Sequence, residues 1–336
     1  MEKKLSFVIP CYKSEKTVGS VIAEIRDMIS KEAKYDYEII LVNDGSPDDV
    51  WDVIKEYADR DAHILGVNLA KNFGQHSAVL AGYHYCTGDY VISLDDDGQT
   101  PAGEVPKLLD ELEKGYDVVY AKYEEMHQKA FRRFGSDFAR RMSDYIFGVK
   151  GYYTGSFFVA RKFIIEEMIR YDNCYPYLGG LVLRTTRNIG YVSVQHNDRM
   201  SGASGYSLKK LFSLWFNGFT AFSVKPLEIS TYIGFFIAFI GFVYTIVIIV
   251  RRLFISELQA IIPYGWSSQT SIILVIGGLI LINMGLMGEY IGRIYICINN
   301  SPQFVVKETY GNKNTEDGLT PKGSVEDETD YTDSML

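Results

Sequence analysis

The segment Tyr90-Val91-Ile92-Ser93-Leu94, followed at once by Asp95-Asp96-Asp97-Gly98-Gln99, decides the fold of this chain. Its first half is rich in β-branched and aromatic residues and is preceded by a Thr-Gly-Asp turn, which is typical of a buried strand. Its second half places three carboxylates directly after that strand. Ligands of open α/β sheets bind just beyond the carboxyl ends of the strands. The segment therefore predicts a ligand site at one edge of a sheet.

The spacing of the acidic residues points to a divalent cation. Asp95 and Asp97 are two residues apart, so their side chains share a face in extended backbone. Two converging carboxylates repel each other, whereas Mg²⁺ or Mn²⁺ between them and a diphosphate keeps both ionised. Gln99, two residues further on, offers a neutral oxygen ligand. A solvated acidic loop, or a cap for a helix that begins near Pro101, would also explain this segment taken alone.

Strands and helices alternate along the first half of the chain. Because the expected strands are continuously apolar, the pattern predicts an α/β fold with a mainly parallel, Rossmann-like sheet that is covered by helices on both faces. We expect the first strand to stop at Pro10. The predicted strands are Leu5–Ile9, Tyr37–Val42, His63–Leu69, Tyr90–Leu94 and Asp117–Ala121, and the predicted helices are Thr17–Ser30, Val50–Tyr57, Gln75–Cys86 and Leu108–Lys114.

The loops after the first two strands carry polar groups in place of a glycine-rich phosphate loop. Neither Gly-x-Gly-x-x-Gly nor Gly-Lys-Ser/Thr follows the first strand, so the two common nucleotide-binding motifs are missing. The segments Pro10–Glu15 and Asn43–Ser46 occupy those places instead. Acidic groups there can accept hydrogen bonds from a base and a ribose, and the Tyr12 ring offers a stacking surface. Each loop by itself is also an ordinary solvated turn.

Composition narrows the class of protein. The chain has 336 residues, a formal net charge of −8 and a pI near 5.3, which argues against a nucleic-acid binder. Its four cysteines are far apart, and its five histidines lack metal-binding spacing. No signal peptide is recognised at the N-terminus, so we expect the first domain in the cytosol.

Two later segments are long and apolar enough to cross a membrane. Ile229–Val250 and Thr270–Met287 contain no charged residue, and each can span about 30 Å of hydrocarbon. Glycines in the second segment suit close helix packing, and association with a second copy of the chain. Ser207–Phe222 carries an aromatic face and predicts a helix in the membrane interface, with a core helix as the alternative.

We therefore expect four regions. These are a cytosolic catalytic domain (1–206), an interfacial helix and linker (207–228), a membrane domain of two helices (229–298) and a cytosolic tail (299–336) that is disordered after about residue 310.

Several motifs resemble those of the family 2 glycosyltransferases that act on dolichyl or undecaprenyl phosphate. The resemblance runs from Leu5 to about Val306. It is carried by Val8–Tyr12, Val42–Ser46, Lys71–Gln75, Ala81-Gly82, Gly88-Asp89, Asp95–Pro101, Arg199–Tyr206, Gly265-Trp266, Gly277-Gly278 and Gly288–Arg293.

The resemblance implies a GT-A-type domain that moves a sugar from a nucleotide sugar, expected to be UDP-linked, to a polyprenyl phosphate, expected to be undecaprenyl phosphate, with inversion of the anomeric centre. It implies a bacterial inner membrane protein with two spans, which uses Mg²⁺ or Mn²⁺ and works on the lipid bilayer. The implied nucleotide-binding residues are Pro10, Tyr12, Glu15, Asp44, Lys71 and Asp95. The implied metal ligands are Asp95, Asp97 and Gln99. The implied catalytic residues are Asp95, Asp97, Arg199 and Ser156. The implied phosphate or lipid contacts are Arg132, Arg133, Arg140, Arg199 and Ser204, with Arg141 in the same cluster.

Some positions depart from the family pattern. Gly98 stands where leucine is usual, and Gly205 stands where lysine is common. Ser156 stands where many relatives carry aspartate, which puts a carboxylate base at that position in doubt.

Two other functions remain as alternatives. A processive polysaccharide synthase shares the aspartates but needs a Gln-x-x-Arg-Trp motif, which Gln195–Met200 does not supply. A membrane-anchored scaffold would bind nucleotide sugar without turnover, and it would not require metal ligands directed at a leaving group.

Overall fold

The computed structural model describes residues 3–32, 34–123, 152–172, 176–194, 265–299 and 302–311, together with 227, 230–237, 239–240, 243 and 246. The chain divides into two compact units, which we describe separately. The sheet unit comprises Met1–Arg140, Gly151–Ser207 and Ser301–Leu336, and the helical unit comprises Arg141–Lys150 and Leu208–Asn300.

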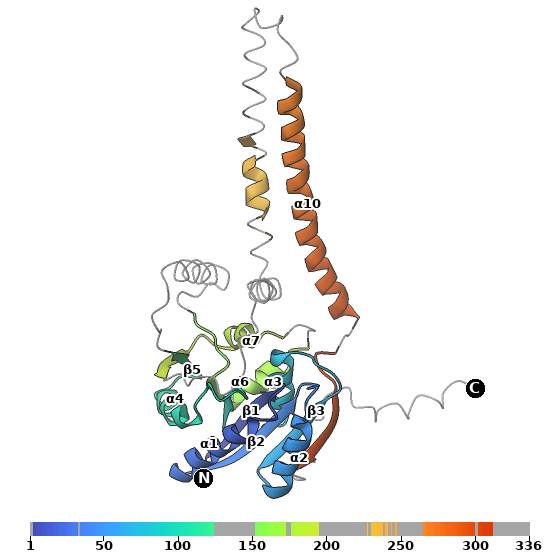
Figure 1. Cartoon of the computed structure of the whole chain (residues 1–336). Coiled ribbons are helices and arrows are strands. Elements are labelled where there is room, and N and C mark those ends of the chain that lie inside the picture. The colour runs from blue at the N-terminus through green and yellow to red at the C-terminus, as the bar shows by residue number, and fades with distance from the viewer. Residues whose placement is uncertain are drawn as a thin grey trace, which may run out of the picture. The chain divides into compact units, whose positions relative to one another are not determined.

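One mixed sheet organises the sheet unit (Figure 1). Its strand order is β7-β5-β6-β4-β1-β2-β3-β8. The central pairs β4–β1, β1–β2 and β2–β3 are parallel, as is β5–β7, whereas β6 is antiparallel to both of its neighbours and β8 is antiparallel to β3. The prediction of a mainly parallel sheet is confirmed. The strands are β1 (Lys3–Cys11), β2 (Tyr35–Asn43), β3 (Ile64–Leu69), β4 (Tyr90–Ser93), β5 (Val118–Tyr123), β6 (Phe158–Arg161), β7 (Ile189–Val194) and β8 (Val306–Gly311).

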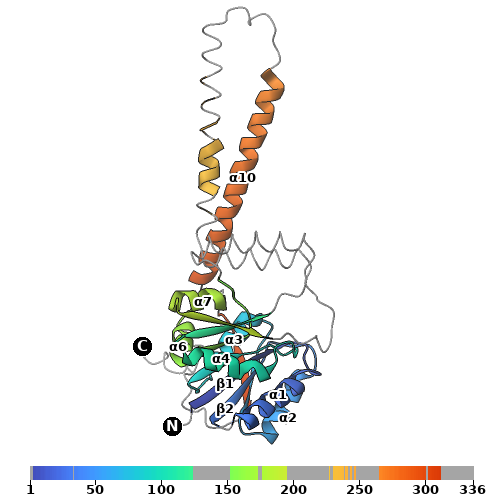
Figure 2. The same ribbon diagram turned by 90° about the vertical axis from the view of Figure 1, so that its left-hand side faces the viewer.

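Helices cover both faces of this sheet, as predicted (Figure 2). Alternate residues of β1, such as Phe7 and Ile9, lie in one core with buried residues of α1, α2 and α4. On the other face, α3 approaches so closely that a Cβ on Gly82 would lie 2.5 Å from Val8 Cγ1. The helices are α1 (Val18–Lys31), α2 (Val50–Arg60), α3 (Gln75–Tyr83), α4 (Val105–Glu113), α6 (Lys162–Ile169) and α7 (Leu178–Thr185), with a 3₁₀ turn at Ala102–Glu104.

The first strand does not stop at Pro10, contrary to our expectation. β1 continues to Cys11, and Pro10 pairs in register with Val42 of β2. On the other side of β1 the paired register with β4 ends at Val8, whose carbonyl accepts from Leu94 N at 3.1 Å. Backbone groups two residues apart face the same neighbour, so Pro10 faces β4 beyond the end of that register. Its missing N–H therefore removes no bond from the paired ladder.

The beginning of the predicted tail belongs to the sheet. β8 pairs with β3 from Leu65↔Gly311 to Leu69↔Val306, and Ala70 N donates to the Val305 carbonyl at 2.9 Å. We expected a cytosolic tail (299–336) that is disordered only after about residue 310, and the structure adds that Val306–Gly311 forms a strand of the sheet. The sequence Val306–Gly311 lacks an apolar face because it forms an edge strand with mostly exposed side chains, which leaves little periodic signal to recognise.

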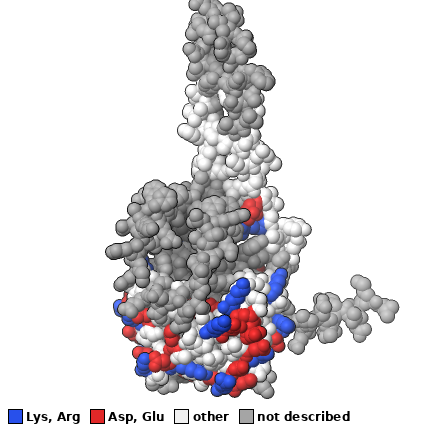
Figure 3. Space-filling view, viewed as in Figure 1, with Lys and Arg blue, Asp and Glu red and all other residues white. Residues whose placement is uncertain are grey.

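A 34-residue helix, α10 (Gly265–Ile298), dominates the described part of the helical unit. Among the described residues, one helical segment is long and apolar enough to cross a membrane. It is Ile276–Ile298 within α10. In Figure 3 the described part of this unit is almost free of charged side chains, whereas acidic and basic side chains are mixed over the sheet unit.

The first predicted span is described at 230–237, 239–240, 243 and 246, and these residues are helical. Ser230 Oγ donates to Asn283 Oδ1 of α10, which links the two apolar segments through polar side chains. A Cβ added at Gly277, Gly278 or Gly285 would meet nothing within 4 Å, so close packing at these glycines stays a prediction. The predicted interfacial helix Ser207–Phe222 lies outside the described residues.

A buried carboxylate stabilises the edge of the sheet where the parallel strands begin. Glu38 accepts from Lys4 Nζ at 2.8 Å, Ser6 Oγ at 2.5 Å and Thr87 N at 2.6 Å. Burial alone would raise the pKa of this carboxyl, but these bonds outweigh it and hold the pKa below its ordinary value of 4.5. Ionised Glu38 therefore stabilises the fold above the pKa of the unfolded chain, and this contribution is lost as the pH falls through the lower folded-state pKa.

We predict that Glu38→Gln lowers the melting temperature of the detergent-solubilised protein at neutral pH, through a loss of about 2 kcal/mol. The gap from the unmodified protein should narrow as the pH falls below 4.5 and through the lower folded-state pKa, because protonated Glu38 resembles glutamine. Glu56→Gln, at a side chain that is 68% exposed, is the control and should leave the melting temperature unchanged. A gap that stays constant down to pH 3 would contradict this account.

Candidate functional site

The carboxyl ends of three parallel strands meet at one edge of the sheet. β1 lies between β4 and β2, with Cys11 in register with Asn43 and Val8 in register with Ser93. The loops that follow these strands carry Tyr12–Glu15, Asp44–Ser46 and Asp95–Gln99. The three polar loops that the sequence places after these strands therefore lie at one edge of the sheet.

Asp95 is held through both carboxylate oxygens. Its Oδ1 accepts from Gln75 Nε2 at 2.8 Å, and its Oδ2 accepts from Ser156 Oγ. Burial, together with the neighbouring carboxylates of Asp97 and Asp96, raises the pKa of Asp95 to about 6 although both hydrogen bonds oppose the rise. Negative charge is therefore crowded at this edge, and a cation there would relieve the repulsion.

Asp97 and Gln99 form a tight turn after Asp95. Gln99 N donates to Asp97 Oδ1 at 3.0 Å, and Gly98 between them has φ of 72°. This left-handed conformation is costly for a side chain with a Cβ. The departure from the family pattern at Gly98 thus has a backbone reason, because leucine would be strained in this turn.

Asp96, the middle carboxylate, holds the neighbouring loop. Its Oδ2 accepts from Tyr12 N at 2.9 Å, and burial raises its pKa. The Tyr12 side chain itself is 44% exposed, and the Lys13 ammonium lies 5.4 Å from the centroid of its ring. The Tyr12 ring is therefore accessible, while Asp96 fixes the backbone beneath it, and stacking of a ligand on this ring stays a prediction.

Asp44 is buried, and it faces the protein. Its Oδ1 accepts from Phe73 N at 2.7 Å and its Oδ2 from Gly74 N at 2.9 Å, while Asn72 Nδ2 donates to its carbonyl at 3.1 Å. Burial raises the pKa of this carboxyl against the effect of the two amide bonds. Asp44 thus positions the loop that leads into α3, with exposed Lys71 at its start.

Gly45 allows the loop that begins at Lys71 to lie close to the backbone after β2. It has φ of 56°, and a Cβ there would lie 2.4 Å from the carbonyl carbon of Lys71.

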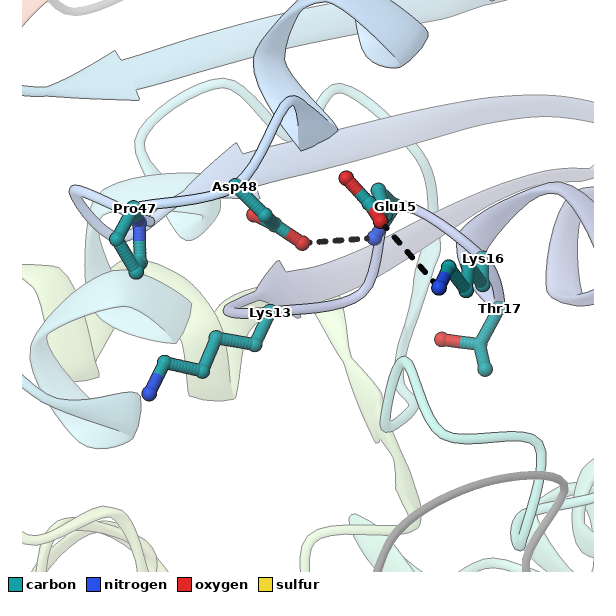
Figure 4. A pocket seen from close by; sticks show the side chains of 6 residues that line it. All are labelled: Lys13, Glu15, Lys16, Thr17, Pro47 and Asp48. Atoms are coloured by element: carbon teal, nitrogen blue, oxygen red, sulfur yellow. Dashed lines mark hydrogen bonds and ion pairs between the residues drawn. The ribbon is translucent and has the colours of Figure 1, made fainter.

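A small open cavity lies between the loops after β1 and β2 (Figure 4). Its volume is about 320 Å³, and Glu15 is the predicted nucleotide-binding residue that lines it. Glu15 N donates to Asp48 Oδ2 at 3.1 Å, and Glu15 Oε2 accepts from Asp49 N at 3.3 Å. Pro10 lies within β1 and is buried. The remaining lining residues are Lys13, Lys16, Thr17, Pro47 and Asp48.

Sequence reasoning missed two residues at the aspartate edge. Gln75 was noticed only as part of Lys71–Gln75, although its amide binds Asp95. Tyr123 ends β5, and burial together with the charges of Asp95 and Asp97 raises the pKa of its phenol, which stays protonated. Nothing in the local sequence indicates that Gln75 binds Asp95 or that Tyr123 lies within the electrostatic influence of Asp95 and Asp97, because these aspartates are at least 20 positions away.

The predicted phosphate contacts lie outside the described residues. This applies to Arg132, Arg133, Arg140, Arg141, Arg199 and Ser204.

Two sequence families match the chain. Residues 6–169 match the family described as Glycosyl transferase family 2, and residues 225–294 match the one described as GtrB C-terminal hairpin.

Individual relatives align over nearly the whole chain. The undecaprenyl-phosphate 4-deoxy-4-formamido-L-arabinose transferase of Yersinia pestis (strain Pestoides F) is 32% identical over 316 residues, which cover 94% of this chain and 96% of that protein. The transferase of the same name from Proteus mirabilis (strain HI4320) is 33% identical over 328 residues, which cover 94% and 97%.

Solved structures are more distant. Glucosyl-3-phosphoglycerate synthase from Mycobacterium tuberculosis, in complex with Mn²⁺, UDP-glucose and phosphoglyceric acid, is 20% identical and covers 64% of this chain and 76% of that chain. The TM-score is 0.48.

We predict that Asp44→Asn destabilises the protein by about 1–3 kcal/mol, because asparagine has one acceptor oxygen for two amide donors and turns its own N–H₂ towards one of them. The melting temperature should fall by a few degrees. Asp110→Asn, at an exposed position on α4, provides the matched control. An Asp44→Asn protein that melts together with the unmodified one would show that the carboxylate does not hold this loop.

Proposed function

Because the chain belongs to the family 2 glycosyltransferases, we propose that it transfers a sugar from a nucleotide sugar, UDP-linked, to a polyprenyl phosphate, with inversion of the anomeric centre. The proposed acceptor is undecaprenyl phosphate, which the names of the relatives from Yersinia pestis and Proteus mirabilis contain. The observation that carries the proposal is the convergence of Asp95, Asp97 and the exposed Tyr12 ring at one edge of a parallel sheet.

The donor would bind along the loops after β1, β2 and β4. Tyr12 offers an exposed ring face to the base, and the Glu15 carboxylate lines the adjoining cavity. Lys71 is exposed at the start of the loop that Asp44 positions, where it can reach a phosphate. Asp95 would lie near the ribose and the sugar. Asp44, whose two oxygens bind backbone amides, would act through that loop.

The chemistry of the donor set fits Mg²⁺ or Mn²⁺. Asp97, Gln99 and Asp95 would provide oxygen ligands. Burial and the nearby carboxylates both raise the pKa of Asp95, and a bound cation would relieve the repulsion between these carboxylates. The described residues contain no group of three or more His, Cys, Asp or Glu side chains arranged around a single point. Such a site suits an ion that takes one or two carboxylates and completes its shell with substrate phosphates. When bound, the cation neutralises charge on the departing nucleoside diphosphate.

The acceptor needs little help from a base. A phosphate monoester is already an anion at neutral pH, so its oxygen can attack the anomeric carbon without first losing a proton to a strong base. Ser156, whose hydroxyl donates to Asp95, fits this requirement because its role is to hold a carboxylate. We assign the lipid phosphate to Arg199, Ser204 and arginines among Arg132, Arg133, Arg140 and Arg141, since arginine pairs well with phosphate oxygens.

We further propose two membrane spans, with the sheet unit on the cytosolic face of a bacterial inner membrane. The strands β1–β7 precede α10 in the chain and β8 follows it, yet all belong to one sheet. A chain that crosses a membrane and returns to the same sheet must cross an even number of times. The apolar segment Ile229–Val250 supplies the second crossing, in agreement with the name of the hairpin family that matches 225–294.

A donor panel tests the proposal. The full-length protein in detergent is incubated with undecaprenyl phosphate, Mg²⁺ or Mn²⁺, and radiolabelled UDP- and GDP-sugars, with a UDP-linked 4-deoxy-4-formamido-L-arabinose among them. We expect one UDP-sugar to yield a labelled product that partitions into organic solvent. Absence of product from every donor, in a protein that still binds nucleotide, would favour the scaffold alternative.

Asp97→Ala should abolish this transfer and leave the melting temperature close to that of the unmodified protein. Removal of divalent cations with EDTA should have the same effect, and added Mn²⁺ should reverse it. Asp110→Ala, which removes an exposed carboxylate on α4, should retain full turnover. Substantial turnover by the Asp97→Ala protein would refute the assignment of Asp97 to the metal.

A further inference from the structure

A row of polar side chains crosses three neighbouring strands at the functional edge of the sheet. Asn43 of β2 is in register with Asn68 of β3, and Asn68 is in register with Glu308 of β8. Directly paired residues project from the same face of a sheet. The row therefore connects the loop after β2 with the strand that follows the membrane helix in the chain.

The hydrogen bonds along this row all run in one direction. Ser46 N donates to Asn43 Oδ1 at 3.1 Å, Asn43 Nδ2 donates to Asn68 Oδ1 at 2.8 Å, and Asn68 Nδ2 donates to Glu308 Oε1 at 2.8 Å. Asn43 and Asn68 are 5% and 7% exposed, so their amide groups depend on each other for partners.

The carboxylate at the end of the row sets this direction. An ionised carboxylate only accepts, whereas an asparagine amide can present either its oxygen or its nitrogen. Because Glu308 must receive a donor, Asn68 turns its N–H₂ outward and its oxygen towards Asn43. Asn43 must then turn its N–H₂ to Asn68, which leaves its own oxygen for Ser46 N. Such chains are mutually polarised, so a change at one end is felt at the other.

Ser46 passes the effect to the loop after β1. Its hydroxyl accepts from Lys13 N at 2.8 Å and donates to Asp48 Oδ1, while Asp48 Oδ2 accepts from Glu15 N. Lys13 has φ of 58°, a conformation that a lysine adopts only when its surroundings hold it there. The segment held in this way is Tyr12–Glu15, which carries the proposed contacts to the nucleotide.

We propose that Glu308 is a positioning residue for the nucleotide-binding loop, and that it acts through the Asn68–Asn43–Ser46 chain. The inference rests on the proposed function in that the ligand of this loop is a nucleoside diphosphate. The strand β8 then contributes to the donor site, although Glu308 follows α10 and lies 240 positions after Asn68 in the sequence.

Three variants of the full-length protein distinguish two roles for Glu308, which either positions the nucleotide-binding loop or only stabilises the edge strand β8. Glu308→Ala removes the acceptor at the end of the chain, whereas Glu308→Gln retains a carbonyl oxygen that Asn68 Nδ2 can reach. Tyr310→Phe is the matched control on the same strand, because it removes the bond from Tyr310 Oη to Asp59 Oδ1 (2.8 Å) and leaves the polar row untouched.

Two measurements are made on each variant in detergent. The first is the dissociation constant for UDP. The second is deuterium exchange of the backbone amides in residues 10–17, which reports on the Lys13 N–H whether or not nucleotide binds. Glu308→Ala should weaken UDP binding about tenfold and accelerate exchange in this segment, as expected for the loss of one bond in a coupled network. Glu308→Gln should restore most of both properties, and Tyr310→Phe should change neither.

Unchanged exchange in residues 10–17 of the Glu308→Ala protein would overturn the inference, as would equal effects of Glu308→Ala and Tyr310→Phe. If the unmodified protein binds no UDP, the proposed nucleotide fails, and the exchange measurement alone decides whether Glu308 holds the loop.

Discussion

The crowding of three carboxylates at the end of β4 is the constraint on which the rest of the site depends. Asp95, Asp96 and Asp97 follow a buried strand at the centre of the sheet, where burial and then the charges of Asp97 and Asp96 raise the pKa of Asp95 to about 6. The fold tolerates this arrangement because each carboxylate has its own hydrogen-bond donors. Asp96 takes the Tyr12 amide, Asp95 takes Gln75 and Ser156, and Asp97 takes the amide of Gln99. Local bonds thus hold the charges in place, and a cation together with a diphosphate would stabilise them further.

Many polar side chains near this edge accept hydrogen bonds from backbone amides, and only some are exposed to the proposed ligand. Asp44 uses both oxygens on the amides of Phe73 and Gly74, and Asp96 fixes the chain beneath Tyr12. Charge-assisted bonds of this kind give rigid loops without a glycine-rich phosphate motif. If the exposed Tyr12 ring and Lys71 bind the donor as proposed, the backbone that carries them is already ordered, which lowers the entropic cost of binding.

The sequence predicted the features that depend on local pattern. Continuous apolar strands, helical periodicity and the placement of polar loops at strand ends identified the central parallel strands and the edge where Tyr12, Asp44 and Asp95 meet. It did not predict that β6 lies antiparallel between β4 and β5, because strand order depends on pairing between distant segments. It also missed β8, whose exposed side chains carry no apolar alternation, and the contacts of Gln75 and Glu308, which only the folded chain brings to their partners. Local signals therefore located the edge of the sheet at which we propose the site, and long-range pairing determines how its loops are held.

We propose that Asp97 and its neighbours hold a divalent cation jointly with the diphosphate of a nucleotide. Binding of Mn²⁺ to the full-length protein, measured by electron paramagnetic resonance with and without UDP, tests this most directly. We expect weak Mn²⁺ binding to the protein alone and a much higher affinity when UDP is present. UDP affinity should rise by the same factor when Mn²⁺ is present, because the coupling between two ligands is reciprocal. Mn²⁺ binding that is indifferent to UDP would contradict it.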